Sequence, residues 1–375
     1  MPLSLRDRLQ GWRDRLLADR GFQRFAALFP LTRPVATAEA AALFDLCAGF
    51  VYSQILFACV RLDIFRALEA GPMQPVRLAQ RIGLAPEETV RLVRAAESLR
   101  LLEMRRDGRV GLGRRGAALL ANPVVAAMVE HHALLYRDLA DPVALLKGEA
   151  DDTLLRSYWP YAHTDQPAEL DPAAIDAYTR LMAASQSGVA EEVLDVYPMR
   201  GPTSLVDVGG GDGSFLEAVA ARHGELALAL FDLPPVAEIA RARLKERGLE
   251  DRIEVHGGDF LNDRLPAGAD VYSLIRILLD HPDDRVLRIL AAIRRAIPPH
   301  GVLLIAEPLS GIDPGSRVAD AYFGFYLRAM GQGRTRSLAE ISALLAGAGF
   351  REPRVLAAKR PVLTRVVVAR PQSSA

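Results

Sequence analysis

Residues 204–214 carry the pattern that most plainly predicts a ligand site. An apolar run, Ser204–Val208, leads into Gly209-Gly210-Gly211-Asp212-Gly213, and a helical pattern begins at Ser214. Glycines allow a sharp turn and the close approach of a ligand. Ligands of parallel sheets bind at the carboxyl ends of the strands. A dinucleotide fingerprint requires glycine where this chain has Ser214, so the corner favours a ligand of another kind.

Three carboxylates lie at the ends of successive predicted strands. Asp207 precedes the glycines, where it can hold the turn or reach the ammonium group of a ligand. Asp232 can accept hydrogen bonds from both hydroxyls of a ribose. Asp259 can accept one from an adenine amino group, beside the stacking ring of Phe260. Helix capping or turn formation explains any one of these aspartates equally well, but it explains three in order poorly.

S-adenosylmethionine (SAM) fits this pattern, because it carries no phosphate and needs neither a phosphate-binding lysine nor a Walker-type hydroxyl. We therefore predict a SAM site that releases S-adenosylhomocysteine. The two cysteines, Cys47 and Cys59, offer no metal framework, and we expect no metal. The predicted cofactor-binding residues are Asp207, Gly209, Gly211, Asp232, Leu233, Asp259, Phe260 and Arg276.

Short aliphatic runs alternate with amphipathic helical patterns from Thr203 onward. This alternation predicts an α/β fold in which helices cover both faces of a parallel sheet. The tail predicts two further strands around Arg360-Pro361, one of them an antiparallel edge strand.

Residues 37–120 have a different pattern, which predicts a long apolar helix Ala38–Cys59, further helices, and a hairpin turn at Asp107-Gly108. Helices followed by a hairpin form a winged-helix pattern, which often binds DNA. Glu87, Glu88 and Glu97 dilute the positive charge that DNA binding needs. Lysines and arginines total 46 against 46 acidic residues, so we expect contact with protein and not with nucleic acid.

Residues 1–36 alternate arginine and aspartate with Leu5, Leu9, Trp12, Leu16 and Leu17 near helical spacing. One interpretation is an amphipathic helix packed on the protein itself or on a dimer mate. Another is a helix on a membrane surface, with Trp12, Phe22, Phe25 and Phe29 on its apolar side.

The cysteine content and the amino-terminal sequence bear on the compartment. Two cysteines predict a reducing compartment and a pair of small buried hydrophobic residues. The start lacks the apolar core of a signal peptide. The apolar stretch Cys47–Val60 is too short to span a bilayer. We expect a cytoplasmic protein, with peripheral attachment to the inner membrane as the alternative.

Residues 205–350 resemble the class I SAM-dependent O-methyltransferases of the hydroxyindole and plant phenolic type, and the helical amino-terminal half resembles their dimerisation domain. Residues 43–65, 131–146, 274–284 and 326–337 resemble bacterial carotenoid O-methyltransferases that act on hydroxyneurosporene and demethylspheroidene. The resemblance implies a Rossmann-like domain with a mostly parallel seven-stranded sheet, a winged-helix-like dimerisation domain, and a homodimer.

The same resemblance implies a lipophilic acceptor, the tertiary 1-hydroxyl of an acyclic carotenoid. The alternatives are an aromatic or polyketide acceptor, a SAM-sensing winged-helix regulator, and a tailoring enzyme that transfers no methyl group. The implied domains are an amphipathic extension 1–36, a dimerisation domain 37–190 and a catalytic domain 191–375.

The catalytic residues of the phenolic relatives are not all present. Their histidine base begins an H-D-W-S-D-E motif, and the matching residue here is Leu279, with His281 at the tryptophan position. Their two supporting glutamates correspond to Glu307 and Gly333. A tertiary alcohol does not ionise, so its proton must leave during or after attack. We predict that His281 collects it and that Glu307 orients or assists. An equally good explanation of His281 is structural: it is the residue before the helix that begins at Pro282.

The pair His131-His132 is the second candidate for collecting the proton, and the resemblance implies that its helix reaches over the acceptor pocket. We expect adjacent histidines to face apart, so that at most one of them lines the site. Arg334 and Arg336 are expected to pair locally. The predicted substrate-binding residues are His131, His132, Met182, Tyr322, Phe323 and Tyr326. For each of them, an ordinary place in the protein core is the alternative explanation.

Overall fold

A computed structural model gives the fold and describes residues 4–150, 152–158, 188–311, 316–357 and 364–372. The chain forms two compact units, Met1–Ala121 and Asn122–Ala375. Met182 and the Arg360-Pro361 step lie outside the described residues.

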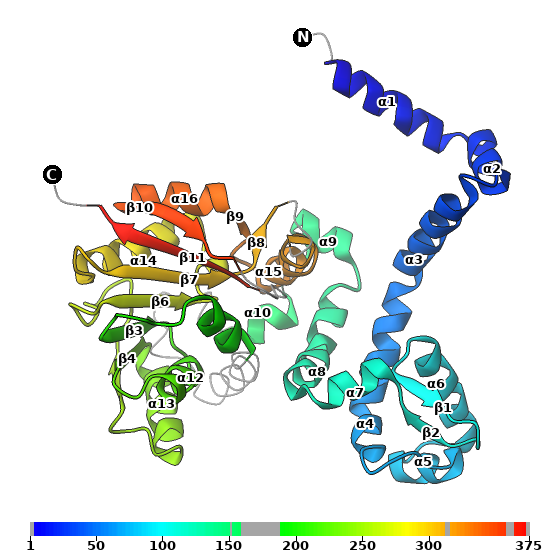
Figure 1. Ribbon diagram of the computed structural model, residues 1–375, viewed down its shortest axis with the longest axis horizontal. Helices are drawn as coiled ribbons and strands as arrows, with labels where there is room; N and C mark the ends of the chain where they lie inside the picture. The colour runs from blue at the N-terminus through cyan, green and yellow to red at the C-terminus, as the bar shows by residue number, and fades with distance from the viewer. Residues whose placement is uncertain (1–3, 151, 159–187, 312–315, 358–363, 373–375) are drawn as a thin grey trace. The chain divides into compact units, whose positions relative to one another are not determined.

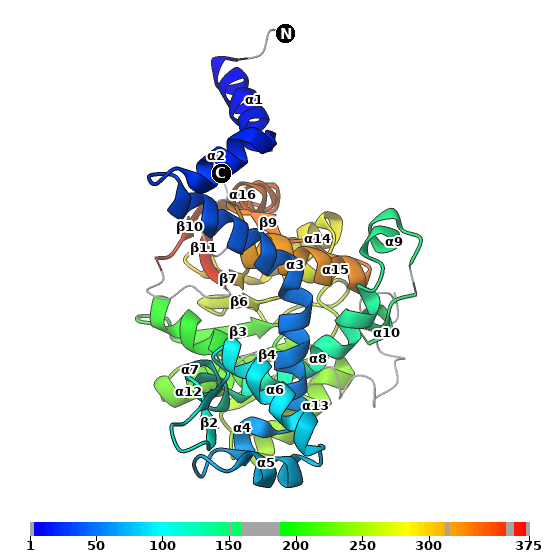
Figure 2. The same ribbon diagram turned by 90° about the vertical axis from the view of Figure 1, so that its right-hand side faces the viewer.

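Three successive helices open the first unit, drawn in blue in Figure 2. α1 (Leu5–Ala18) begins at a capping box formed by Ser4 and Asp7. α2 (Arg20–Leu28) begins at Asp19, whose carboxylate accepts the backbone N–H of Phe22 at 2.7 Å. The first two helices leave large apolar side chains exposed, namely Leu5, Leu9, Trp12, Leu17, Phe25 and Leu28.

α3 (Arg33–Arg61) is longer than the apolar stretch recognised in the sequence. It has 29 residues, and among the described residues it is the one unbroken helix long and apolar enough to cross a membrane. The predicted helix Ala38–Cys59 is confirmed. Because it begins well before Cys47, the expectation drawn from Cys47–Val60, that this region is too short to span a bilayer, is wrong by length and composition. Only 6% of its apolar window is buried.

The rest of the first unit packs around buried side chains that include Cys59, Phe65 and Val93. The hairpin predicted at Asp107-Gly108 is present between β1 and β2. Cys59 is buried as predicted, and burial raises the pKa of its thiol to about 12. Cys47 is exposed, so the prediction of a second buried cysteine is wrong. The elements are α4 (Ile64–Ala67), α5 (Pro75–Ile82), α6 (Pro86–Ser98), β1 (Leu102–Met104), β2 (Val110–Leu112) and α7 (Arg114–Leu120).

A seven-stranded sheet forms the centre of the second unit, in the order β10-β11-β7-β6-β3-β4-β5 (Figure 1). Every neighbouring pair from β7 to β5 is parallel, which confirms the predicted fold class. The strands are β3 (Ser204–Val208), β4 (Ala227–Asp232), β5 (Ile253–Gly257), β6 (Val271–Ile275), β7 (Val302–Glu307), β10 (Phe350–Val355) and β11 (Arg365–Pro371).

The last strand corrects one expectation. β11 runs antiparallel to both β7 and β10, and it lies between them and not at the edge of the sheet. Residues 366–369 of β11 are all buried. An all-apolar strand is stabilised most when the sheet continues on both sides of it, and this explains its inner position.

Helices cover both faces of the sheet. Consecutive residues of a strand point to opposite faces, so Leu205 joins the cluster under α12 (Ser214–Arg222) and α13 (Pro234–Glu246). Val206 joins the cluster under α14 (Asp283–Ala296) and α16 (Leu338–Gly347).

Several short elements complete the second unit. The carboxylate of Asp138, the last residue of α8, accepts the backbone N–H groups of Leu154 and Leu155 at 2.8 and 2.9 Å, and so fixes the start of α10. The elements are α8 (Pro123–Asp138), α9 (Pro142–Lys147), α10 (Leu154–Tyr158), a 3-10 turn η3 (Leu278–Asp280), β8 (Leu309–Ser310), a π-helical segment η4 (Val318–Phe323), α15 (Gly324–Met330) and β9 (Arg336–Ser337).

Candidate active site

The glycine corner follows β3 as the sequence predicts. Gly209 has a φ of +75° and Gly211 a φ of +59°, a conformation that glycine adopts without strain. A β-carbon on Gly209 would lie 2.5 Å from Cδ1 of Ile277, and one on Gly210 would lie 2.9 Å from Oδ2 of Asp207. The corner therefore needs bare backbone at both positions.

Asp232 connects the end of β4 to this corner. Its Oδ2 accepts the N–H of Gly211 at 2.8 Å, and its Oδ1 accepts the N–H of Leu233 at 2.7 Å. Burial raises the pKa of its carboxyl to about 6. Each carboxylate oxygen retains acceptor capacity for a ligand, so the two roles, holding the loop and binding a ribose, are compatible.

Asp207 lies beneath the corner and is 1% exposed. The parallel register places Ser273 of β6 opposite it, and the Ser273 hydroxyl donates to Oδ1 at 2.6 Å. Burial, helped by the charge of Asp232, raises the pKa of Asp207 to about 7 against the opposing hydrogen bond from Ser273. A nearby cation would stabilise the charged form of this carboxyl, so the buried Asp207 favours a cationic ligand.

The third acidic strand end forms a turn. Asp259 accepts the N–H of Leu261 at 2.8 Å and the side-chain amide of Asn262 at 2.6 Å. The neighbouring ring of Phe260 meets the ring of His281 edge to face, with centroids 5.7 Å apart. The structure thus brings His281 together with the ring predicted to stack on adenine.

His281 is held neutral at its position. Burial, together with the positive charges of Arg285 and Arg336, lowers the pKa of its imidazole to about 4. Its Nδ1 is buried without a hydrogen-bond partner. The ring can therefore accept a proton only weakly where it lies.

Glu307, at the end of β7, is 2% exposed. Its Oε1 accepts the backbone N–H groups of Leu278 and Leu279, the latter at 3.1 Å. Burial raises the pKa of this carboxyl to about 7, although the charge of Arg336 acts in the opposite direction. Its contacts hold the 3-10 turn that carries Leu279.

Arg336 holds the other side of the same turn. Its side chain is 1% exposed, and it donates to the carbonyl oxygens of Leu278 and His281, both at 2.7 Å. It also pairs with Asp283, as does the more exposed Arg334. The predicted local pairing of both arginines is confirmed. Sequence reasoning missed the burial of Arg336, because its partners are backbone groups more than 50 residues away.

Gly333 explains the missing second glutamate. Its φ is +83°, and a β-carbon there would lie 2.3 Å from the carbonyl oxygen of Leu279. The neighbouring Arg334 N–H donates to that same oxygen at 2.8 Å. The chain at 333 packs directly on the turn, and no side chain fits.

Asp280 is a second group that sequence reasoning missed. Burial raises the pKa of its carboxyl to about 8, the charge of Arg276 opposes that rise, and Glu307 adds to it. Arg276 itself has a φ of +59°, which is uncommon outside glycine and is found at functional sites. The one sequence feature that pointed to Asp280 was its position next to Leu279, where the phenolic relatives have their histidine base.

The predicted acceptor residues form a connected cluster. Nε2 of His131 lies 2.8 Å from the hydroxyl oxygen of Tyr326, and Nε2 of His132 lies 2.8 Å from that of Tyr322. The Arg276 guanidinium lies 6.0 Å from the centre of the Phe323 ring. Leu279 packs in the same buried cluster as Phe323 and Tyr326, so the base position of the relatives adjoins these aromatic rings.

The expectation that the two histidines face apart is wrong. Adjacent helical residues are about 100° apart around the axis, so both imidazoles can reach one neighbouring element. Tyr322 and Tyr326 are four residues apart along that element, and their stacked rings have centroids 5.8 Å apart.

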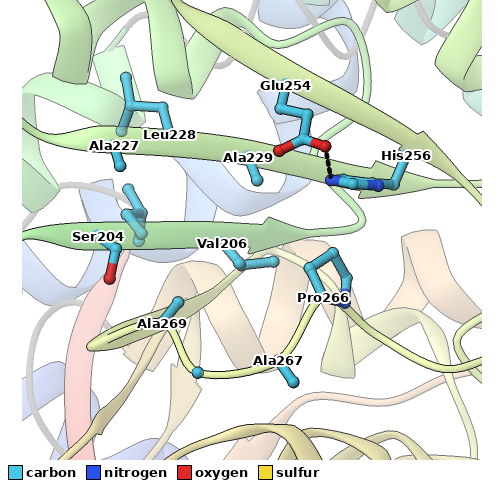
Figure 3. A pocket seen from close by; sticks show the side chains of 12 residues that line it. Ser204, Val206, Ala227, Leu228, Ala229, Glu254, His256, Pro266, Ala267 and Ala269 are labelled. Atoms are coloured by element: carbon cyan, nitrogen blue, oxygen red, sulfur yellow. Dashed lines mark ion pairs between the residues drawn. The ribbon is translucent and has the colours of Figure 1, made fainter.

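A separate hollow of about 270 Å³ lies over the first residues of β3 and β4, bounded by residues 266–269 (Figure 3). His256 and Glu254 of β5 form an ion pair of 3.1 Å on its wall. It lies near the amino ends of these strands, away from the glycine corner. No group of three or more metal-ligand side chains occurs among the described residues.

Comparison with known families decides the class of protein. The family model of an O-methyltransferase domain matches residues 136–351, and that of the O-methyltransferase dimerisation domain matches residues 44–122. The chain belongs to the O-methyltransferase family. This O-methyltransferase is 46% identical to demethylspheroidene O-methyltransferase of Cereibacter sphaeroides, over 95% of this chain and 93% of that one. The demethylspheroidene O-methyltransferase of Rhodobacter capsulatus is 42% identical, over 92% and 87%.

Solved structures agree with this family. Mitomycin 7-O-methyltransferase MmcR superposes with a TM-score of 0.74 at 28% identity, over 90% of this O-methyltransferase and 99% of that chain. CalO1, a methyltransferase of calicheamicin biosynthesis solved in its S-adenosylhomocysteine-bound form, has a TM-score of 0.72 at 26% identity, over 89% and 98%. The expected α/β methyltransferase fold is confirmed.

Proposed function

We propose that this O-methyltransferase moves the methyl group of SAM to the tertiary 1-hydroxyl of an acyclic carotenoid of the hydroxyneurosporene or demethylspheroidene type. The observation that carries the proposal is the 46% and 42% identity to two demethylspheroidene O-methyltransferases over nearly the whole chain. The loss of the phenolic base at Leu279 fits an acceptor that does not ionise.

The glycine corner and the acidic strand ends fit SAM. The backbone at Gly209 and Gly210 leaves no room for β-carbons, and the buried Asp207 gains from a nearby cation. SAM supplies an activated methyl group on a sulfonium. Asp232 would accept from the ribose, and Asp259 with Phe260 would hold adenine, beside Leu233 and Arg276. The catalytic roles of His281 and Glu307 stay predictions.

A methyl-transfer assay tests the proposal. Purified protein would be incubated with SAM carrying a labelled methyl group and a panel of 1-hydroxy carotenoids and water-soluble phenols. We expect label in the carotenoids. Asp232→Asn is the matched control, because it weakens the hold on the glycine corner and should lower SAM affinity. Label in the phenols alone would contradict the carotenoid acceptor.

We also propose that the chain forms a homodimer through α3 and does not bind nucleic acid. The dimerisation match begins at residue 44, inside α3, where large apolar side chains are exposed. A contiguous apolar surface of this kind normally meets a partner. Light scattering would report the mass, and a salt-dependent shift of labelled DNA would contradict the second part. The exposed side chains are Leu43, Phe44, Leu46, Phe50 and Val51.

For localisation we propose the cytoplasm, with peripheral attachment to the inner membrane through α1 and α2. Leu9 and Trp12 are exposed on α1 beside arginines such as Arg8 and Arg15, an arrangement that suits an anionic membrane surface. Flotation with anionic and neutral vesicles tests it. Binding that Trp12→Ser leaves unchanged would contradict it.

A further inference from the structure

Two histidine–tyrosine pairs join α8 to the segment η4–α15. His131 meets Tyr326 and His132 meets Tyr322, each at 2.8 Å between ring nitrogen and hydroxyl oxygen. The two tyrosine rings stack on each other. The pairs thus form two parallel hydrogen-bonded links with similar chemistry.

The two links differ in burial. His131 is 7% exposed and Tyr326 is 6% exposed, so solutes do not reach this pair. His132 and Tyr322 are only half-buried, and the Tyr322 hydroxyl also contacts the sulfur of Met128 at 3.6 Å. The second pair is the one that an acceptor molecule can meet.

The accessible pair is also connected to the position that the base occupies in the phenolic relatives. The Tyr322 ring packs edge to face on Phe323, with centroids 5.1 Å apart. Phe323 lies in the buried cluster that contains Leu279. Tyr322 packs against the same cluster, so the accessible pair and residue 279 border one group of aromatic side chains.

We propose that Tyr322 and His132 together take the proton of the acceptor hydroxyl, in place of a base at residue 279. This rests on the proposed function. The acceptor oxygen forms its bond to the methyl carbon while the carbon–sulfur bond breaks, and that electron pair stays on sulfur. The acceptor proton passes to the Tyr322 hydroxyl oxygen, and the phenolic proton of Tyr322 passes to Nε2 of His132. His132 then releases a proton to solvent.

The electrostatics support this direction of transfer. Burial lowers the pKa of His132, which favours the neutral imidazole, and its Nε2 already lies within hydrogen-bond distance of the Tyr322 hydroxyl. Burial raises the pKa of Tyr322 to about 12 against the opposing charge of Arg276, so the phenol keeps its proton until one arrives. The groups that face this pair are His131, Tyr136 and Arg276. His281, by contrast, contacts Phe260 and has a buried Nδ1 without a partner.

Three matched substitutions test the proposal on whichever hydroxylated acceptor the wild-type protein methylates fastest. His132→Gln keeps a side chain able to bond Tyr322 but cannot take up a proton. We expect its kcat to fall about a hundredfold with KM changed by less than about twofold. The affinity for SAM, measured by calorimetry, should not change. His281→Gln tests the other predicted base, and it should lower kcat less than His132→Gln does. His300→Gln replaces an exposed histidine paired with Asp270, and it is the control that should keep kcat.

The pH profile gives a readout that a merely structural role would not move. Wild-type kcat should fall at acid pH as His132 becomes protonated, and this fall should vanish in His132→Gln. A readout without turnover is the ¹⁵N shift of His132 Nε2, which should move in Tyr322→Phe. That variant keeps the ring that packs on Tyr326 and Phe323, and it replaces His132→Gln if the latter does not fold.

The outcomes separate the two proposals. Full activity of His132→Gln overturns the Tyr322–His132 pair and leaves the proposed function intact. An inactive His281→Gln variant does the same. Wild-type activity confined to phenols, lost in His132→Gln, supports the pair and overturns the carotenoid acceptor. A wild-type chain that methylates no acceptor overturns both.

Discussion

The guanidinium of Arg336 donates from Nε and Nη2 to the same carboxylate oxygen of Asp283, at 2.9 and 2.7 Å. The arginine is buried, and the aspartate lies in the first turn of α14. The same guanidinium reaches the carbonyl oxygens that precede the helix. One side chain therefore fixes both the 3-10 turn and the start of α14.

Replacement of Arg336 by methionine should be strongly destabilising. It removes one of the two arginine partners of the half-exposed Asp283 and leaves the carbonyl oxygens of Leu278 and His281 without their donor. We expect a loss of about 2–6 kcal/mol in the free energy of unfolding, measured by urea denaturation. Arg334→Ala is the control, because Arg334 pairs with Asp283 at the surface, and its loss should cost less than about 1 kcal/mol. Equal losses in both variants would contradict this reading.

Gly333→Ala should disturb the turn that carries Leu279. The new β-carbon would lie 2.3 Å from a backbone oxygen, at a positive φ. Gly268→Ala is the matched control, because Gly268 has a φ of +90° with open space around it. The control should lose about 1–2 kcal/mol from backbone strain alone. We expect Gly333→Ala to lose more unfolding free energy than this control and to show a lower kcat. A loss smaller than that of the control would show that the turn can move to make room for the β-carbon.

Glu307 should matter as an acceptor of backbone hydrogen bonds more than as a charge. Glu307→Gln keeps an oxygen for the N–H groups of Leu278 and Leu279, and we expect a loss below about 1 kcal/mol. Glu307→Ala leaves both buried N–H groups unpaired, which should cost about 2–6 kcal/mol. Thermal or urea unfolding measures both. A stable Glu307→Gln variant with little activity would instead indicate that the charge takes part in catalysis.

Asp207 should make the free protein less stable as the pH rises. Its folded pKa, about 7, lies above the ordinary value of 3.8, so the folded state binds the proton more tightly. The associated stability is present below about pH 4 and is lost by about pH 7, up to about 4 kcal/mol. Asp207→Asn keeps an acceptor for Ser273 and removes this slope. Unfolding at pH 5 and pH 8 tests it, and a difference from wild type that is independent of pH would contradict it.

The local patterns of the sequence predicted the sheet and the glycine corner well. The apolar run of β3 and the turn chemistry of Gly209–Gly213 depend on neighbours in the chain, and the structure has both as expected. The inner position of β11 depends on pairing with β7, more than 50 residues away, and no local pattern records it. The long helix α3, by contrast, was predicted from its own residues, at Ala38–Cys59.

The candidate site was predictable in composition and less so in geometry. His131, His132, Tyr322 and Tyr326 were all named from the sequence, but their pairing depends on the register between α8 and η4–α15. Arg336 had no signal beyond its residue type, because a buried arginine is rare and its partners are carbonyl oxygens. Long-range packing supplied what the sequence pattern could not.

The close packing at Gly333 limits how this chain can change its substrates. Restoring histidine at residue 279 would return only one of the two acid–base groups that this chain lacks, because a glutamate at 333 has no space until the opposing backbone shifts. The benefit of either substitution thus depends on prior movement of the turn. Directed evolution toward phenols would have to vary residues 277–281 and 331–334 together.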